Sequence, residues 1–476
     1  MLTPSLPNSR PNTPANLDYG YVWLISVVAA LGGLLFGWDW VVIGGAKPFF
    51  ERFFQIQNNA ALSGWVNSCA LIGCLGGALT SGVLSDNFGR RRLLLASAAL
   101  FAITSVGNGL AGSLGLFIFW RMLGGVAIGL ASSLSPMYIS EVAPAAMRGR
   151  LVSVNQLTIV VGVLMAQLIN WWLVRGLPSG ATDDFIVHSW FGQQGWRWMF
   201  ALTAAPSLLF VLGMLAVPES PRWLISRGLT DRARAILARI GGDEYAEVEI
   251  REVRAAMTQD SKESGVRVAD LFRPGLAKVL VLGIVLAIFQ QWCGINVIFN
   301  YAEEIFRAAG YDISSVLKNI AWTGSVNLVF TFVALGFVDR VGRRPLMLIG
   351  SFGLAAIYLV LGFCYHRHVT GLPVLLLVLA AIGFYAMSLA PVTWVVISEI
   401  FPNRIRGAAM SVAVMALWIA CFLLTYTFPI LNRNLGASGT FWLYGLICVL
   451  GGIFIAAKLP ETKGKTLEEI ESDLGY

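Results

Sequence analysis

Charged side chains are scarce in this sequence. Only 13% of the 476 residues are Asp, Glu, Lys or Arg, whereas 57% are hydrophobic. A soluble chain normally carries about 25% charged residues. A larger core does not absorb the apolar excess, because long soluble chains divide into domains instead of extending one core. The surplus apolar surface therefore faces lipid, and we expect an integral membrane protein.

Groups that carry enzyme or metal chemistry are also scarce. The six cysteines lie in or beside apolar runs without metal-ligand spacing, and the three histidines lie in predicted loops. We find no nucleophile paired with a base and no phosphate-binding loop. We therefore expect no enzyme activity, no metal site and no cofactor. The net charge of +7 does not indicate nucleic acid binding, because the excess basic residues lie in short loops between apolar runs.

Long apolar runs dominate what is present. A membrane-spanning helix needs about 20 apolar residues, and twelve runs meet that rule. They fall near 22–44, 61–84, 92–112, 114–137, 151–173, 196–217, 278–300, 316–338, 345–366, 371–398, 408–429 and 438–459. The sequence predicts an all-α membrane protein with twelve transmembrane helices in two six-helix halves.

The expected domains follow from these runs. A tail precedes the first half, a charged stretch separates the halves, and a second tail ends the chain. In that charged stretch Leu229, Ala233, Ile236 and Ile240 recur at helical spacing, which favours amphipathic helices over a disordered linker. The expected boundaries are 1–21 for the N-terminal tail, 22–217 for the first half, 218–277 for a cytoplasmic helical linker domain, 278–459 for the second half and 460–476 for the C-terminal tail.

Positive charges set the expected orientation. With both termini in the cytoplasm, the predicted cytoplasmic segments carry 25 Lys and Arg residues and the external segments carry 8. Cytoplasmic loops of membrane proteins carry such an excess. We expect a multi-pass protein of the plasma membrane, the inner membrane in a bacterium, with both termini cytoplasmic and with the monomer as its working state.

Three motifs occur twice, about half the chain apart. They are an acidic residue before Gly-Arg-Arg, a Ser-Glu pair before Arg-Gly, and Pro-Glu before a hydroxyl residue. Transporters are commonly built from repeated halves with the substrate site between them. Opposite charges at neighbouring helix ends, Glu141 to Arg148 and Glu399 to Arg406, can latch one face shut. We predict a cytoplasmic gate made of Asp86, Arg90, Arg91, Glu141, Arg148, Glu219, Arg222, Asp339, Arg343, Arg344, Glu399, Arg406 and Glu461.

Two ionisable residues, Asp39 and Arg121, fall inside predicted spans. Both lie roughly 8–10 Å below the outer surface at helical rise, so an ion pair between them would relieve the cost of burying either charge. One interpretation is a structural salt bridge. The other is a proton switch in which the aspartate titrates, because arginine stays charged.

The chain resembles the sugar porter family of the major facilitator superfamily. The similarity runs from about residue 22 to 466 and rests on GxxxDxxGRR from Gly82, PESPRWL from Pro218, QQWCGIN from Gln290, DRVGRR from Asp339 and PETKG from Pro460. Within the family, the sequence is most similar to bacterial D-xylose–proton symporters. The resemblance implies that an aspartate at position 39, together with Arg121, accompanies proton symport.

Amide and aromatic side chains lie near mid-membrane. Gln290, Gln291, Asn327 and Trp418 share a depth of roughly 15–20 Å, and amides both donate to and accept from sugar hydroxyls. A single amide is also explained by an interhelical hydrogen bond, and a tryptophan by packing. The resemblance implies a sugar site formed by Gln156, Gln290, Gln291, Asn296, Asn327, Trp394 and Trp418, with Phe36 near the pocket.

We therefore expect alternating-access symport of a proton with a monosaccharide, a hexose or pentose such as glucose or xylose. Asn300 replaces a common tyrosine, and Leu417 and Val163 replace amides found in xylose symporters, so the sugar stays open. A passive sugar facilitator, a polyol or cyclitol transporter and a membrane sugar sensor remain alternatives. The expected partners are the sugar, the proton and the lipid bilayer.

Overall fold

A computed structural model describes residues 17–263, 274–402, 405–465 and 469 of the chain. Eleven helices in this part are long and apolar enough to cross a membrane. The last of them, α18 (Arg406–Lys458), has 53 residues. A straight helix of that length would measure about 80 Å, more than twice the hydrocarbon core of about 30 Å. It instead breaks at Gly436 (φ 68°, ψ 173°) and folds back, so it supplies two spans and brings the total to the predicted twelve.

The N-terminal half contains the first six spans. Its helices are α1 (Tyr19–Phe53), α2 (Ala60–Phe88), α3 (Arg90–Leu110), α4 (Leu114–Val142), α5 (Arg148–Val174), the short α6 (Asp183–His188), a π-helical segment η1 (Phe191–Gly195), α7 (Trp196–Ala201) and α8 (Ala204–Ala216). The sixth span is made of η1, α7 and α8 in succession.

The C-terminal half supplies the other six spans. Its helices are α11 (Pro274–Trp292), α12 (Ile295–Asn300), α13 (Ala302–Ala308), α14 (Ile313–Val341), α15 (Arg343–His366), α16 (Leu372–Met387), α17 (Leu389–Ile400) and α18. Two of these spans are broken. The first is interrupted between α11 and α12, where Gly294 adopts a φ of 86°, and the second is interrupted at Ser388 between α16 and α17. Broken helices are typical of substrate sites in transporters.

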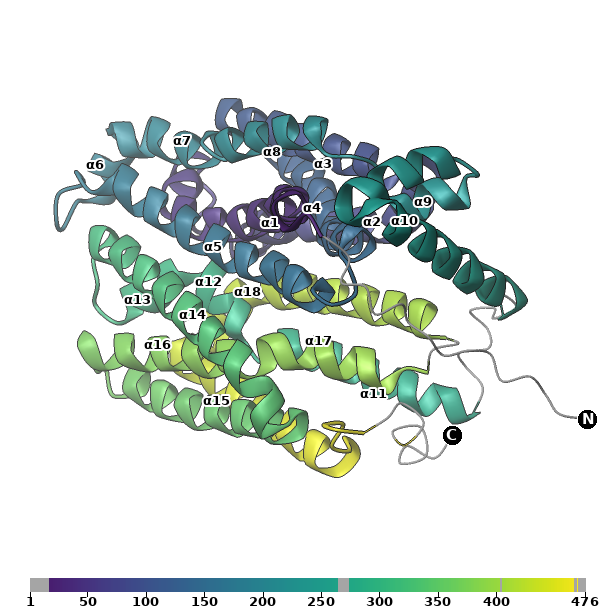
Figure 1. Cartoon of the computed structure of the whole chain (residues 1–476). Coiled ribbons are helices and arrows are strands. Elements are labelled where there is room, and N and C mark those ends of the chain that lie inside the picture. The colour runs from purple at the N-terminus through teal and green to yellow at the C-terminus, as the bar shows by residue number, and fades with distance from the viewer. Residues whose placement is uncertain (1–16, 264–273, 403–404, 466–468, 470–476) are drawn as a thin grey trace, which may run out of the picture.

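The two halves lie one above the other in Figure 1, the first in purple to teal and the second in green to yellow. Inside the halves, α1 packs on α5, α2 on α4 and α15 on α18. The halves meet where α5 packs on α14, α2 on α18, and α1 on α12 and α13. Helix α1 therefore belongs to the core of one half and also contacts the other.

Two linker helices join the halves. They are α9 (Pro221–Ser226) and α10 (Thr230–Glu263), the latter bent at Gly242 (φ 87°). Of the four residues in the predicted amphipathic pattern, Ala233 and Ile240 are buried and Ile236 is half-buried, whereas Leu229 is 40% exposed. The backbone amide of Asp18 donates to the carbonyl of Ile240 at 2.8 Å. We call the membrane side that carries these helices the linker side, on the right in Figure 1, and the opposite side the far side.

Candidate functional site

Asp39 and Arg121, which the sequence places at matching depth, form a buried ion pair between α1 and α4. Nη1 of Arg121 donates to both carboxylate oxygens of Asp39, at 3.2 and 3.1 Å. The two residues are only 5% and 3% exposed. The guanidinium also lies over the ring of Phe200, 5.4 Å from its centroid. Isolated, either charge would be costly at this depth, and the pairing offsets part of that cost.

A cavity of about 10 Å³ adjoins this pair. Trp40, Asn67, Asn300 and the two charged residues contribute to its lining. The side-chain oxygens of Asn67 and Asn300 and the Nε of Arg121 are buried and have no hydrogen-bond partner in the described structure. Asn300 belongs to α12, so polar groups from both halves face this space.

A chain of hydrogen bonds connects the amides of the broken helix. The side-chain amide of Gln290 donates to the hydroxyl of Tyr385 at 2.7 Å, that of Gln291 donates to Oε1 of Gln290 at 2.7 Å, and that of Asn296 donates to Oε1 of Gln291. The three amide residues are each less than 9% exposed. The break at Gly294 brings Asn296 back toward Gln291. These amides form a preorganised polar surface suited to a ligand rich in hydroxyls.

Three aromatic rings lie across the boundary between the halves. Trp418 on α18 lies 6.2 Å from Phe36 and 6.0 Å from Trp40, centroid to centroid, and the last two lie 5.9 Å apart on α1. Asp39 lies between the two members of this pair in the sequence, directly before Trp40 on the same helix. The ion pair and the aromatic surface are therefore held by the same helix.

The other predicted sugar residues lie outside this hydrogen-bonded chain. Gln156 on α5 is exposed, and Trp394 on α17 and Asn327 on α14 are half-buried. The backbone carbonyl of Asn327 accepts from the hydroxyl of Thr331 at 2.8 Å. Among the described residues, ring contacts join Phe36 to Trp418, and hydrogen bonds join the α11–α12 amides to one another. Membership of the three other residues in the sugar site stays a prediction.

The repeated motifs form a polar network at the linker side of the first half. Glu219 accepts from the backbone amides of Arg90 and Arg91, each at 2.9 Å, and so satisfies the free N–H groups at the start of α3. Nε of Arg90 lies 3.1 Å from Glu141. The hydroxyl of Ser220 donates to Glu141 as well. Asp86 completes the network through an ion pair of 3.0 Å with Arg90.

The second half repeats the network with its own copy of each motif. Glu461 accepts from the backbone amides of Arg343 and Arg344 at 3.0 and 3.1 Å. Arg343 lies 3.2 Å from Glu399, which also accepts from the hydroxyl of Thr462 at 2.6 Å. The side chain of Asp339, the remaining predicted member, lies outside the described part of the structure.

The two motif glycines, Gly89 and Gly342, are required by both conformation and space. Their φ angles are 95° and 105°, in the region that favours glycine. A Cβ would approach the carboxylate of Glu219 to 2.4 Å at the first position and that of Glu461 to 2.9 Å at the second. The glycines therefore let each carboxylate reach the start of the next helix.

The predicted pairs Glu141–Arg148 and Glu399–Arg406 differ from what is observed. Among the described residues the two glutamates pair with the motif arginines Arg90 and Arg343 instead. Arg406 donates from Nε to the carbonyl of Phe401 at 3.1 Å. The sequence prediction took neighbours along the chain as partners, whereas helix packing places the start of α3 or α15 closer to each glutamate.

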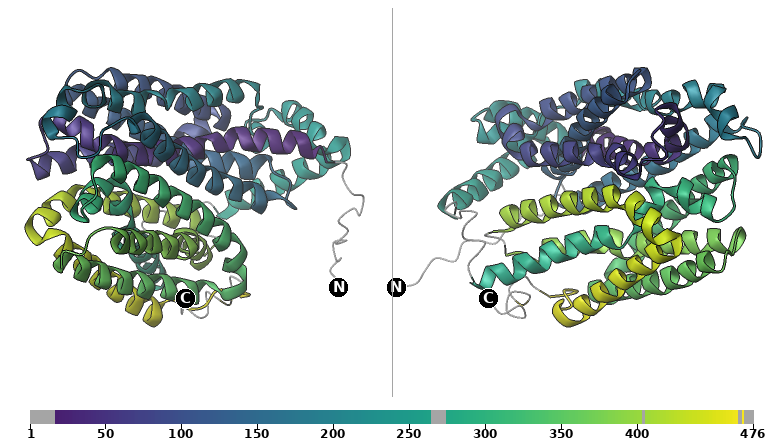
Figure 2. Two further views of the ribbon diagram at one scale, coloured as in Figure 1. Left: turned by 90° about the vertical axis from the view of Figure 1, so that its left-hand side faces the viewer. Right: turned by 180° about the vertical axis from the view of Figure 1, so that it is seen from behind.

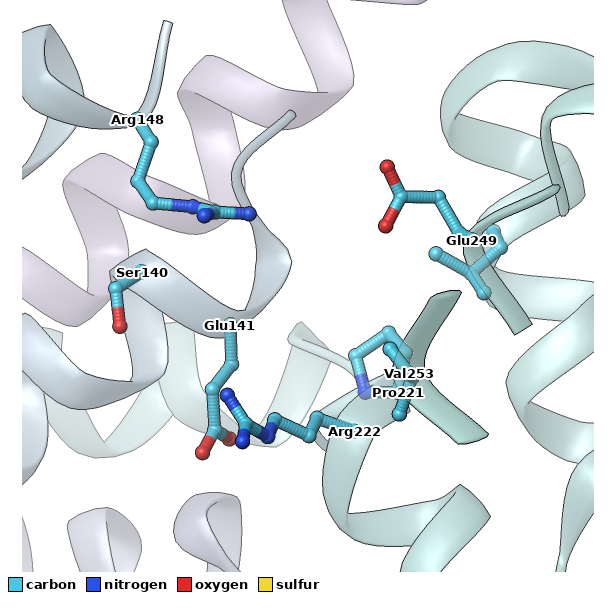
Figure 3. Close-up of a pocket in the computed structure, with 8 residues that line it drawn as sticks. Ser140, Glu141, Arg148, Pro221, Arg222, Glu249 and Val253 are labelled. Atoms are coloured by element: carbon cyan, nitrogen blue, oxygen red, sulfur yellow. The ribbon is translucent and has the colours of Figure 1, made fainter. Parts of the chain in front are cut away.

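Arg148 instead faces the linker. It lines a pocket of about 160 Å³ with Glu141, Arg222 and Glu249, and Figure 3 shows Arg222 beside Glu141 while Arg148 extends on the opposite side of the pocket. Burial raises the pKa of Glu249, and the charge of Arg148 opposes this shift. The gate candidates of the first half thus surround a contact between the six-helix half and α10.

The sequence prediction did not select several polar residues that the structure places in networks. Tyr385 was passed over because a phenol in an apolar run gives no periodic signal. The charged residues at the far side were counted only as loop residues, although ionisable groups so near a span are functional candidates. We call them the far-side cluster: Lys47, Glu51, Arg52, Asp183, Glu303, Glu304 and Arg307.

The fold and these networks define a class of protein, a twelve-helix membrane transporter built from two repeated halves. Comparison with known proteins gives the family. The family model described as "Sugar (and other) transporter" matches residues 25–474. The chain belongs to this family, the sugar porters of the major facilitator superfamily, and is a transporter, not an enzyme.

Individual relatives agree with this assignment. The D-xylose-proton symporter of Escherichia coli K12 is 40% identical, with 97% of each chain covered. The arabinose-proton symporter of Bacillus subtilis 168 is 39% identical, also with 97% of each chain covered. The inward-open structure of the xylose transporter from E. coli superposes with a TM-score of 0.83 at 38% identity, covering 95% of this chain and 99% of that one.

Proposed function

We propose that this protein is a secondary active transporter that carries a monosaccharide together with a proton by alternating access. The observation that carries the proposal is the buried Asp39–Arg121 pair, held on the same helix as the aromatic residues Phe36 and Trp40. Helix α1 also contacts α12 and α13 of the second half. A change of charge at Asp39 therefore acts on a helix that carries aromatic residues of the proposed site and lies at the boundary between the halves.

Asp39 is the proposed proton carrier. Protonation removes its negative charge, weakens the ion pair and leaves Arg121 to find other acceptors, of which Asn67 and Asn300 offer unpartnered oxygens at the same cavity. Since Asn300 lies on α12, this exchange links the protonation of one half to the position of the other. Arg121 stays charged throughout.

The amide chain and the aromatic cluster form the proposed sugar site. The amides of Gln290, Gln291 and Asn296 hydrogen-bond with ring hydroxyls, and Trp418 with Phe36 covers the apolar C–H face of the ring. Hexoses and pentoses such as glucose and xylose both fit this chemistry. The relatives named for xylose and arabinose support a monosaccharide as the substrate class.

We further propose that the linker side faces the cytoplasm and the far side the exterior of a bacterial inner membrane. The excess of Lys and Arg in the segments on the linker side supports this orientation. Each chain contains both halves and the complete boundary between them, which supports a monomer as the working unit. From here on, the far side is called external.

Uptake into proteoliposomes tests the proposal. The purified protein is supplied with labelled glucose, xylose, arabinose and a polyol, with and without a proton gradient. We expect accumulation of at least one monosaccharide above equilibrium only when the gradient is imposed. Equilibration without accumulation would support a passive facilitator, and accumulation of the polyol alone would support a polyol transporter.

A further inference from the structure

The far-side cluster contains ion pairs that cross between the halves. Nζ of Lys47 on α1 lies 2.9 Å from Glu51 on the same helix and also pairs with Glu304 on α13. Nη1 of Arg52 on α1 lies 3.3 Å from Glu303 on α13. The two cations are only 3% and 5% exposed. Two pairs between α1 and α13 therefore hold the external ends of the halves together.

The far-side cluster also includes hydrogen bonds to a third helix. Glu51 also accepts from Ser63 and from Asn67 on α2, so the network extends into a third helix. Close backbone packing accompanies it, since a Cβ at Gly44 would lie 2.3 Å from the carbonyl oxygen of Phe299 on α12. Tight approach of α1 to the α12–α13 segment is thus what brings Lys47 and Glu304 into contact.

Negative charge exceeds positive charge in this closed arrangement. The described cluster holds four carboxylates and three cations, so one carboxylate lacks a full counter-charge. Glu304 is the candidate, because its Oε1 pairs with Lys47, which also serves Glu51, while its Oε2 is buried without a hydrogen-bond partner. The side chain of Glu304 is 25% exposed, but its Oε2 is buried. A partly buried carboxylate without a full counter-charge is costly, and binding a proton relieves that cost.

We propose that Glu304 is a second proton-binding group, which takes up a proton from the external solution when the external gate closes and returns it there when the gate opens. The group is not used by the coupling step assigned to Asp39. The proposal goes beyond the proposed function and needs from it only the name of the side that faces outward.

The sign of the pH effect follows from linkage. Burial raises the pKa of Glu304 from its ordinary 4.5 to about 7, with a further rise from Glu303 and Glu51 and a decrease from Lys47. In the open gate α13 separates from α1 and the carboxyl is solvated. A group whose pKa is higher in the closed state binds its proton more tightly there, so closure gains stability as the pH falls below about 7 and loses it as the pH rises through that value.

The size of the effect is bounded by the same values. Between pH 4.5 and about 7 the ratio of closed to open gate changes by at most about tenfold for each pH unit. A low external pH therefore favours closure of the external gate. Closure of this gate is the step that follows sugar and proton binding from outside during import. The charged and titratable groups that face Glu304 are Lys47 and Glu51 on α1, Glu303 on α13, and Tyr301 before α13.

The test measures the gate without sugar, so its result does not depend on coupling at Asp39. Spin labels are attached through non-natural residues at Ser179 and Leu372, exposed positions at the external ends of the two halves, in full-length protein in lipid nanodiscs. Pulsed electron resonance then gives the distance distribution from pH 5.5 to 8.5. We expect the ratio of the short-distance to the long-distance population to increase by at least about fivefold on acidification from pH 8 to pH 6.

Glu304→Gln removes the titrating group and should hold the short distance at every pH. Asp184→Asn is the matched control, since Asp184 is an exposed external carboxylate outside the cluster, and it should behave like wild type. Glu304→Asp retains a carboxyl and should retain the pH effect, which guards against a misfolded glutamine variant. A wild-type distribution that does not change with pH, or an undiminished shift in Glu304→Gln, would overturn the proposal.

Discussion

Arg121 reaches Asp39 through a single nitrogen, Nη1, which lies 3.2 and 3.1 Å from the two carboxylate oxygens, while its Nε has no partner in the described structure. The guanidinium therefore does not use its planar fork in the two-nitrogen mode typical of strong arginine–carboxylate pairs. Such a pair is more easily exchanged for other acceptors than a bidentate one. This is the behaviour expected of a switch more than of a structural bridge.

The sugar site is tested first by Gln290→Ala. The change removes an amide that bonds Tyr385 and Gln291, and it leaves sugar hydroxyls without a partner. Affinity measured by calorimetry should fall by about 1–3 kcal/mol. Tyr385→Phe, which removes only the supporting hydroxyl, should have a smaller effect. An unchanged affinity in a folded Gln290→Ala protein would remove this residue from the site.

The ring of Trp418, which lies between the halves, should contribute to sugar affinity. Trp418→Ala deletes the contacts with Phe36 and Trp40, and sugar affinity should fall by about 1 kcal/mol or more. Trp172→Ala is the matched control, because Trp172 is 53% exposed on the outer surface of α5. Equal affinities in the two variants, measured by tryptophan fluorescence titration, would show that Trp418 only fills space.

The motif glycine Gly89 should be sensitive to a single methyl group. Gly89→Ala places a Cβ 2.4 Å from the carboxylate of Glu219 at a φ of 95°, and should cost about 1–3 kcal/mol of stability. Gly82→Ala should be tolerated, because a Cβ there meets nothing within 4 Å. Thermal unfolding in detergent compares the two. Equal melting temperatures would contradict the role given to the Gly89 turn.

A variant of Arg148 tests the gate predicted at the linker side. Its neutralisation in Arg148→Gln should remove the attraction between Arg148 and Glu249 across the pocket, shift the population toward the form open at the linker side, and slow transport while sugar still binds. Arg150→Gln, at an exposed neighbouring position, serves as the control. Distances across the cytoplasmic ends measure the shift, and identical distributions in the two variants would reject the latch.

The fold was largely predictable because apolar runs of membrane length are unambiguous. The exception is instructive. The run that begins at Val22 was expected to end near residue 44, yet α1 continues as a helix to Phe53. Lys47, Glu51 and Arg52 stopped the prediction because they are charged, but pairing across the halves buries them. A hydropathy pattern does not show that charged residues will be paired and buried, so it places the end of the helix too early.

The sequence predicted the membrane depth of the site residues, but it did not predict every ion-pair partner. Asp39 and Arg121 lie at equal depth because helical rise is regular, and the structure brings them together. The partner of Glu141 was predicted incorrectly, because sequence proximity favoured Arg148 whereas the packing of α3 on α4 supplies Arg90. Contacts between helices that are distant in the chain depend on packing, which a single sequence does not encode in any local pattern.

The most direct test of the account compares wild-type protein with Asp39→Asn in proteoliposomes under an imposed proton gradient. Asparagine has no titrating carboxyl and imitates the protonated form. We expect Asp39→Asn to bind sugar and exchange it across the membrane without accumulating it, whereas the wild-type protein accumulates it. Gradient-driven accumulation by Asp39→Asn at the wild-type level would contradict the account, because the proton would then be carried by another group.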